Sequence, residues 1–163
     1  DLWFARNAIM DDAGYCFGTV LGQSVFDNSG CVGKSVSLAP EALERVERIR
    51  SMEVENECRV DTSTADLEVR AFWLRSQLLQ QPVRDITESA CIGWQGAVTP
   101  LFAAPNPSSP IVGEIRPGAN VTYSHEQESG WEFVTVSGSD WSIESGGWLD
   151  AGATEVVCAD FAG

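Results

Sequence analysis

Cysteine is the residue type whose spacing in this sequence bears most directly on chemistry. Its five copies stand at positions 16, 31, 58, 91 and 158. They form no CxxC pair, and a single histidine in the whole chain cannot complete a zinc site with them. Disulfide bonds formed in an oxidising compartment therefore explain the cysteines better than metal binding does.

A local pairing of these cysteines is the one that we favour. It joins Cys16 to Cys31 and Cys91 to Cys158. Each bond would stabilise the folded chain by about 2–4 kcal/mol, mainly because it restricts the unfolded chain. Cys58 is left over, and it is either buried and inert or paired with a cysteine upstream of the first residue.

The other residues that could catalyse a reaction lack their usual partners. His125 is the only histidine, so a two-histidine zinc motif cannot form. A Ser-His-Asp triad through His125 has no Gly-x-Ser-x-Gly elbow to support it, and a Cys58–His125 pair would need an activated, accessible thiolate. We therefore expect no catalytic residue, no metal site and no cofactor, and we predict that the protein is not an enzyme.

Arg6 and Asn7, near the start of the chain, allow two interpretations. In the structural one, the Arg6 guanidinium forms a bidentate pair with a carboxylate and Asn7 caps backbone groups. The carboxylate would be that of Asp11, Asp12 or Asp27. In the functional one, Arg6 is exposed in a groove and binds a carboxylate of a peptide or a sugar. The structural interpretation is favoured, and the functional one makes Arg6 a candidate ligand-binding residue.

Aromatic side chains give the clearest lead to a binding site. Trp131 and Trp141 stand beside predicted turns, where an indole ring could stack on a sugar or hold a peptide. Together with Tyr123 and Asn106 they outline the candidate ligand-binding surface. The alternative for each ring is ordinary core packing, which is the role that we predict for Trp148.

The N-terminal part of the sequence predicts helices. One covers Trp3–Met10 and ends at Gly14, since glycine tolerates the left-handed conformation that follows a helix. Another begins at Ala39-Pro40-Glu41, because proline suits the first helical turn and Glu41 favours its positive end. A third is expected over Asp66–Leu79. Its apolar residues recur every three or four positions, at Leu67, Ala71, Leu74 and Leu78.

Beyond residue 96 the pattern changes to short strands separated by turns. The predicted strands are Val98–Phe102, Ile111–Ile115, Val121–Glu126, Trp131–Val136 and Gly147–Leu149. Short strands at this spacing are typical of a small barrel or sandwich. Residues 82–96, which come before them, are expected to be a connector.

The front of the chain resembles the YARHG domain, a bacterial extracytoplasmic module. The resemblance rests on Arg6-Asn7 followed by apolar residues, on Gly-Tyr-x-Phe at residues 14–17 and on the helix that begins at Pro40-Glu41. It covers about Leu2–Glu53. Residues 10–14, Met-Asp-Asp-Ala-Gly, replace the five-residue string that names the family, so its Arg-His pair is absent.

A second resemblance, to bacterial SH3-like domains, covers about Ala97–Ala151. Its motifs come in order: Pro-Ile-Val-Gly at 110–113, Pro-Gly at 117–118, Gly-Trp-x-Phe at 130–133 and Gly-Trp-Leu at 147–149. The two resemblances imply an α+β protein in three parts. Residues 1–60 are a mostly helical YARHG-like domain, residues 61–96 a connecting helix and linker, and residues 97–163 a small SH3-like β-barrel.

The charge of the chain limits its partners. It carries 24 acidic and 10 basic residues, a net charge of −14, which repels nucleic acid and anionic lipid. No stretch of the sequence is long and apolar enough to insert into a membrane as a helix. Because the sequence begins at Asp1 without a signal peptide, we expect a secreted or periplasmic protein whose signal has been removed.

These observations favour a non-catalytic binding module of the bacterial cell envelope. As the resemblance implies, its ligand would be peptidoglycan, another wall polymer or an envelope protein. The alternative is a protein–protein interaction or inhibitor module that turns its acidic surface toward a basic target.

Overall fold

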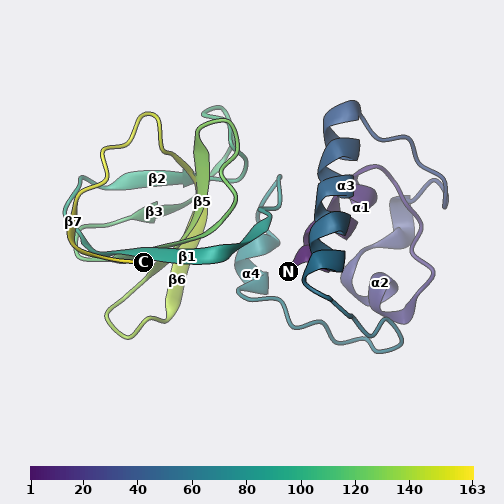
Figure 1. Cartoon of the computed structure of the whole chain (residues 1–163). Coiled ribbons are helices and arrows are strands. Elements are labelled where there is room, and N and C mark those ends of the chain that lie inside the picture. The colour runs from purple at the N-terminus through teal and green to yellow at the C-terminus, as the bar shows by residue number, and fades with distance from the viewer. The chain divides into compact units, whose positions relative to one another are not determined.

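A computed structural model describes residues 1–163 as two compact units, Asp1–Arg70 and Ala71–Gly163. Helices make up most of the regular structure of the first unit, and an antiparallel sheet makes up most of the second (Figure 1). The predicted order of the α+β architecture, with helices first and the sheet after them, is therefore confirmed.

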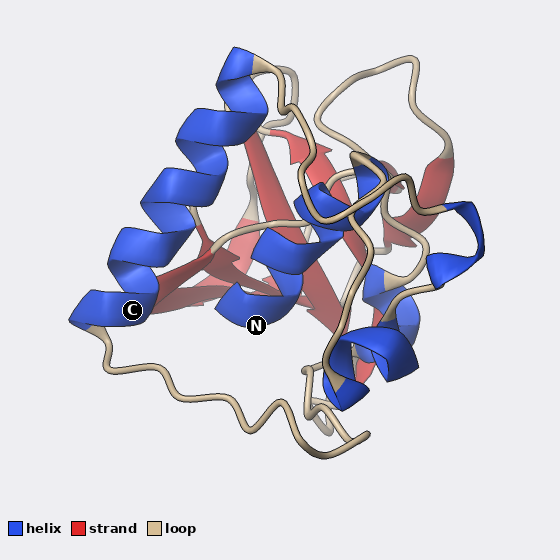
Figure 2. Cartoon of the chain, turned by 90° about the vertical axis from the view of Figure 1, so that its right-hand side faces the viewer, coloured by secondary structure: helices blue, strands red, loops and turns tan.

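Three α-helices and one short 3-10 helix form the first unit, drawn in blue in Figure 2. They are α1 (Leu2–Asp12), α2 (Val20–Val25), η1 (Asn28–Gly30) and α3 (Pro40–Glu55). The predicted start of α3 is confirmed, with Pro40 in its first turn and Glu41 beside it. So is the end of α1, where Gly14 adopts φ +82° directly after the capping residue Ala13.

Stacked aromatic rings form the core of the first unit. The Phe26 ring centroid lies 4.7 Å from that of Phe17 and 5.6 Å from that of Phe4, with nearly parallel planes. Leu67 and Val69, from the end of the unit, pack against these three rings. Helix α3 buries Val46 and Ile49.

The second unit is one antiparallel sheet with a short helix. The helix is α4 (Phe72–Arg75), and the strands are β1 (Arg84–Trp94), β2 (Thr99–Phe102), β3 (Ile111–Ile115), β4 (Asn120–His125), β5 (Trp131–Ser137), β6 (Ile143–Asp150) and β7 (Cys158–Ala162). Their order in the sheet is β3-β2-β6-β5-β4-β1-β7.

This sheet is not closed, so the predicted closed barrel does not form. Strands β3 and β7 are its two edges and do not pair with each other. The reason lies in β1, which was predicted to be a connector. It pairs with β4 on one side and with β7 on the other, and this extends the sheet past β4. No alternation of apolar residues marks β1 in the sequence, because most of its first half is exposed.

Apolar side chains pack on both faces of the sheet. One face carries the Val134 cluster, formed by Cys91, Trp94, Leu101, Ile115, Val121, Val134, Val136 and Leu149. The other carries the Trp148 cluster, formed by Leu74, Leu78, Trp131, Phe133 and Trp148. Neighbours along one strand, such as Phe133 and Val134, belong to different clusters because successive side chains point to opposite faces.

The helix predicted over Asp66–Leu79 is wrong in extent, since only Phe72–Arg75 is helical. The apolar residues that suggested it belong to two different cores. Leu67 packs with the phenylalanines of the first unit, whereas Leu74 and Leu78 belong to the Trp148 cluster of the second. The backbone turns at the boundary, where Ala71 adopts φ +53°.

Gly146 lets α4 approach the sheet closely. A Cβ atom at this position would lie 2.6 Å from Cδ2 of Leu74 and 2.7 Å from the carbonyl oxygen of Val134. Both distances are shorter than a real carbon atom tolerates. Leu74 can therefore rest on strand β6 only because residue 146 has no side chain.

The two disulfide bonds follow the pairing favoured above. Cys16 bonds to Cys31 across 15 residues, and Cys91 bonds to Cys158 across 67 residues. The second bond fastens β7 to β1. Cys58 is not bonded and is exposed, so the prediction of a buried, inert thiol is wrong.

Candidate functional site

Trp131, predicted to contact a ligand, is a core residue instead. Only 8% of it is exposed, and it packs in the Trp148 cluster with its ring edge-on to Phe102 at a centroid distance of 5.5 Å. Its place as the first residue of β5 turns the ring toward this cluster. Trp131 is thus not available for stacking on a ligand, and that part of the prediction is corrected.

Tyr123 lies half-buried on the opposite face, against the Val134 cluster. Its hydroxyl group is buried and makes no hydrogen bond within the protein. Burial, together with the nearby carboxylate of Glu132, raises the pKa of Tyr123 to about 12. Burial also raises the pKa of Glu132. Tyr123 is therefore a neutral residue of the sheet interior rather than part of an open surface.

Asn106 and Trp141 lie in different loops of the second unit. Asn106 belongs to the loop that joins β2 to β3. Trp141 belongs to the hairpin that joins β5 to β6, beyond the pair Ser137–Ile143. Tyr123 and Trp131 pack against clusters on opposite faces of the sheet, so the predicted residues do not share one face.

Arg6, in the first unit, pairs with a carboxylate of the protein, as the structural interpretation predicted. Its Nε–H donates to both carboxylate oxygens of Glu53, at 3.2 Å and 3.0 Å, and this pair joins α1 to α3. The predicted carboxylates were near in sequence, whereas the real one is 47 residues away. Asn7 is buried, and its side-chain amide donates to the carbonyl oxygen of Trp3 at 2.7 Å.

Of the predicted binding residues, Trp141 retains the strongest features of a contact residue. It is 49% exposed at the tip of the β5–β6 hairpin. Its backbone adopts φ +62°, a left-handed conformation that costs a bulky side chain about 1–3 kcal/mol and is most often found at binding sites. A core packing role does not explain a large aromatic ring held outward in this way.

Hydrogen bonds hold the hairpin tip in one shape. The Asp140 carboxylate accepts from the backbone N–H of Ser142 at 3.1 Å and from its hydroxyl at 2.7 Å. The buried Asn120 donates to the carbonyl oxygen of Gly138 at 3.1 Å and accepts from the N–H of Gly93 at 3.0 Å. Trp141 is thus presented by a rigid loop that is tied to strands β1 and β4.

Two carboxylates converge beside Trp141. A Cβ atom on Gly138 would lie 2.6 Å from Oε1 of Glu144 and 3.6 Å from Oδ1 of Asp140, so both oxygens approach the same point. Hydrogen bonds from Ser142 lower the pKa of Asp140 below its ordinary value. No ion pair engages either carboxylate. The tip therefore combines an aromatic face with negative charge.

Further apolar side chains are exposed at the same end of the sheet. Val156 and Val157 precede β7, and both are more than a third exposed. Backbone hydrogen bonds place these segments together, from Gln95 to Val157 and from Gly118 to Trp94. We call this group, with Trp141, Asp140 and Glu144, the Trp141 end of the sheet.

The only histidine is part of a polar network in the second unit. Nε2 of His125 lies 3.1 Å from the Arg75 guanidinium, and Nδ1 lies 3.3 Å from the hydroxyl of Ser124. Because a guanidinium only donates hydrogen bonds, Nε2 accepts here. Arg84 donates to both Ser124 and Glu88. Burial and the neighbouring Arg84 lower the pKa of Arg75 to about 10.

This network was not foreseen from the sequence, because its members are up to 50 residues apart. Strand register brings Arg84 and His125 together across β1 and β4, and helix α4 adds Arg75. In contrast, the sequence around Trp141 contains a local motif that predicts a turn. The string Asp-Trp-Ser at 140–142 is of the kind in which an aspartate side chain fixes a turn.

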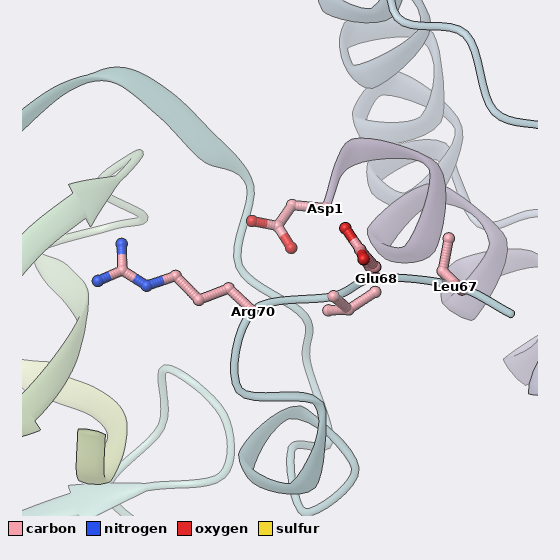
Figure 3. A pocket seen from close by; sticks show the side chains of 5 residues that line it. Asp1, Leu67, Glu68 and Arg70 are labelled. Atoms are coloured by element: carbon pink, nitrogen blue, oxygen red, sulfur yellow. The ribbon is translucent and has the colours of Figure 1, made fainter. Parts of the chain in front are cut away.

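A pocket of about 550 Å³ lies at the end of the first unit (Figure 3). It is lined by Asp1, Leu67, Glu68, Val69 and Arg70. Leu67 and Val69 also serve the phenylalanine core, and the Arg70 side chain extends away from the two carboxylates. The lining thus consists of two carboxylates, two aliphatic side chains that serve the core, and Arg70, whose charged end points away from the carboxylates.

The helices do not suit a bilayer. The longest, α3, has 16 residues, and none has the combination of length and apolar character that crossing a membrane requires.

Two family models match the chain. The model of a domain of unknown function, DUF4453, matches residues 57–163. The model of the YARHG domain matches residues 1–54, which confirms the resemblance at the front of the chain. The model that covers the second unit is not that of an SH3-like domain. No curated protein and no solved structure matches.

Proposed function

This chain belongs to the DUF4453 family, whose model matches more than half of it, and from that premise we propose that it is a non-catalytic binding module of the bacterial cell envelope. YARHG is an extracytoplasmic domain. Two disulfide bonds fit a secreted protein, because such bonds persist in oxidising compartments. The compartment and the fold together support a role in contact with other envelope components.

The exposed, conformationally strained Trp141 is the observation that carries this proposal. Strain of this kind persists where the surrounding structure enforces it and is concentrated at ligand clamps and similar sites. Here Asn120 and Ser142 enforce it through hydrogen bonds. A ring that is held outward in advance loses little freedom when a ligand binds.

The surroundings of the titratable side chains support a non-catalytic role. The acceptor nitrogen of His125 already receives a hydrogen bond from Arg75, so it is not positioned as a base for an added substrate. Four of the five cysteines are in disulfide bonds and cannot act as nucleophiles.

An envelope protein with a basic surface is the ligand that the geometry supports best. A sugar-stacking platform would use several exposed rings, and burial of Trp131 and Trp94 leaves Trp141 as the only exposed tryptophan at its end of the sheet. Charge favours a basic partner. The second unit has eleven acidic residues and three arginines. Of these arginines, Arg84 and Arg116 pair with Glu88 and Glu114 inside the unit.

The test compares two exposed aromatic residues. Trp141→Gly removes the ring and keeps a residue that tolerates φ > 0. Phe161→Ala removes a ring that is 56% exposed on β7 and serves as the control. We expect the unmodified full chain and Phe161→Ala to retain a partner from a solubilised envelope fraction, and Trp141→Gly to lose it. Equal retention by both variants would contradict the role of Trp141.

Peptidoglycan or another wall polymer is the second candidate, because one exposed indole ring can still stack on a sugar. Co-sedimentation with purified sacculi tests it with the same two variants. Sedimentation that depends on Trp141 and is insensitive to salt would favour the wall polymer over the basic protein.

A relationship between the sheet and SH3-like domains also remains a proposal. It is supported by the ordered glycine–tryptophan motifs, because Trp131 and Trp148 both pack in one cluster on the sheet. A solved structure of this unit that aligned with such a domain strand for strand would test it.

A further inference from the structure

We infer that the Trp141 end of the sheet binds an arginine side chain of its partner protein, with the indole ring of Trp141 as the stacking surface and Asp140 and Glu144 as counter-charges. This inference rests on the proposed function and names the chemical group that the binding site takes.

The aromatic ring is the first reason. Trp is the side chain whose face attracts cations best, and a guanidinium is the cation most often found there. Trp141 is half-exposed, and its backbone conformation points to a constraint imposed by something other than packing. A neutral aliphatic partner would use the apolar ring but would leave the two carboxylates beside it without a role.

The carboxylates are the second, independent reason. Asp140 and Glu144 approach one point above Gly138, and neither has a cation as partner within the protein. A cation that approached this point would meet two negative charges that no basic side chain of the second unit neutralises. A planar guanidinium can donate to two carboxylates and stack on a ring at once, which an ammonium group cannot do.

Gly138 is what keeps the point between the carboxylates open. A methyl group at residue 138 would overlap with Oε1 of Glu144 at 2.6 Å and would displace that flexible side chain. Gly138→Ala therefore changes the geometry of the pair without changing its charge. The backbone of Gly138 is not left-handed, so alanine is compatible with the fold.

The overall charge supports an external source for this cation. Among the three arginines of the second unit, Arg116 is the one in the turns at this end, and it pairs with Glu114. Arg84 is bonded to Ser124 and Glu88, and Arg75 is buried. None of these three arginines pairs with Asp140 or Glu144, so within the second unit the two carboxylates are left for a cation from a partner.

The experiment uses the full chain labelled with 5-fluorotryptophan, so that each indole gives its own ¹⁹F resonance. The probe is a hexa-arginine peptide, and hexa-citrulline, which has nearly the same shape without the charge, is the control. We expect hexa-arginine to shift the Trp141 resonance and to leave that of Trp73 in place, although Trp73 is equally exposed. We expect hexa-citrulline to shift neither.

Variants then locate the binding site. Asp140→Asn and Glu144→Gln should each weaken hexa-arginine binding by about two- to fivefold, the range for exposed ion pairs. Gly138→Ala should weaken it to a similar extent. Glu41→Gln removes one negative charge from α3 in the first unit and should leave binding unchanged. A loss of affinity that is the same for Glu41→Gln and Glu144→Gln would mean attraction to the net charge alone and would overturn the inference.

The envelope retention assay separates this inference from the proposed function. Retention lost in Trp141→Gly, Asp140→Asn and Glu144→Gln supports both. Retention lost in Trp141→Gly but unaffected by the two amide variants leaves the proposed function standing and refutes the arginine site. Retention unaffected by Trp141→Gly refutes both.

Discussion

The guanidinium of Arg6 and the carboxylate of Glu53 join helices α1 and α3, with Nε of Arg6 3.0 Å from Oε2 of Glu53. Less than a fifth of either side chain is exposed, so water screens the pair only in part. The arginine that marks the front of the chain is therefore a link between two helices of its own unit.

Removing either side of this pair should destabilise the first unit. Arg6→Gln or Glu53→Gln leaves a charged partner half-buried, and we expect each to lower the free energy of unfolding by about 1–2 kcal/mol. Urea denaturation of the single and double variants would measure this. A coupling energy near zero in the double-mutant cycle would show that the two side chains act independently.

The two disulfide bonds should differ in their contribution to stability. The Cys91–Cys158 bond closes a loop of 67 residues and the Cys16–Cys31 bond one of 15. Loop-closure entropy then predicts losses of about 4 and about 3 kcal/mol when each pair is replaced by serine. Thermal or urea unfolding of the two double-serine variants tests the order. A larger loss for the shorter loop would mean that native contacts outweigh chain entropy.

Gly146→Ala should be among the most damaging conservative changes in the sheet. The new methyl group would overlap with the Val134 carbonyl oxygen, which is part of the backbone and cannot move aside. We expect a loss of about 1–3 kcal/mol in unfolding free energy. Gly30→Ala is the matched control, because its Cβ would meet nothing within 4 Å. Similar losses in both variants would rule out the close approach as the cause.

Trp141→Gly should leave the stability of the protein unchanged or raise it slightly. Glycine relieves the left-handed strain, about 1–2 kcal/mol, but adds freedom to the unfolded chain and gives up the contacts of a half-exposed ring. A calorimetric melting temperature at or above that of the unmodified chain would agree with a ring kept for binding. A marked decrease would show that the ring supports the fold.

The pH dependence of stability should report on Tyr123. Its folded-state pKa is raised from 10 to about 12, so between these values the unfolded chain loses a proton that the folded chain keeps. Stability contributed by this group is thus complete below pH 10 and is lost as the pH rises through 12. Absorbance at 295 nm should show the late titration of Tyr123.

Tyr123→Phe provides the check on that assignment. The variant should lack the late-titrating group and the matching fall in stability, and near pH 7 it should be as stable as the unmodified chain, because the hydroxyl makes no hydrogen bond. A late titration that persists in Tyr123→Phe would contradict the assignment to Tyr123.

The sequence predicted elements best where one core explains their apolar residues. The start of helix α3 was foreseen because Pro40 and Glu41 suit a first helical turn, and its residues Val46 and Ile49 are both buried. The helix over Asp66–Leu79 was not found, since Leu67 belongs to one core and Leu74 to another. The spacing of apolar residues predicts that they are buried, but it does not predict which core they are buried in.

The residues of the candidate site were likewise predictable from the sequence only in part. Trp141 could be named from the sequence because turn residues surround it, and Trp131 was misjudged because turn residues precede it as well. Only the strand register separates the two, by turning Trp131 into a cluster on the sheet. The contribution of Glu144 depends on the shape of the hairpin and could not be foreseen from spacing.

The Cys91–Cys158 bond has a consequence for the survival of the protein outside the cell. The two cysteines are 67 positions apart, and the bond between them closes this part of the chain into a covalent ring that holds most of the sheet. A protease that cuts this ring once, in the loop before β7 or in any other turn, opens the ring without dividing the molecule. The cut product should run as a single band on a non-reducing gel and as two fragments after reduction. The sheet can therefore be nicked and still keep all its strands on one molecule.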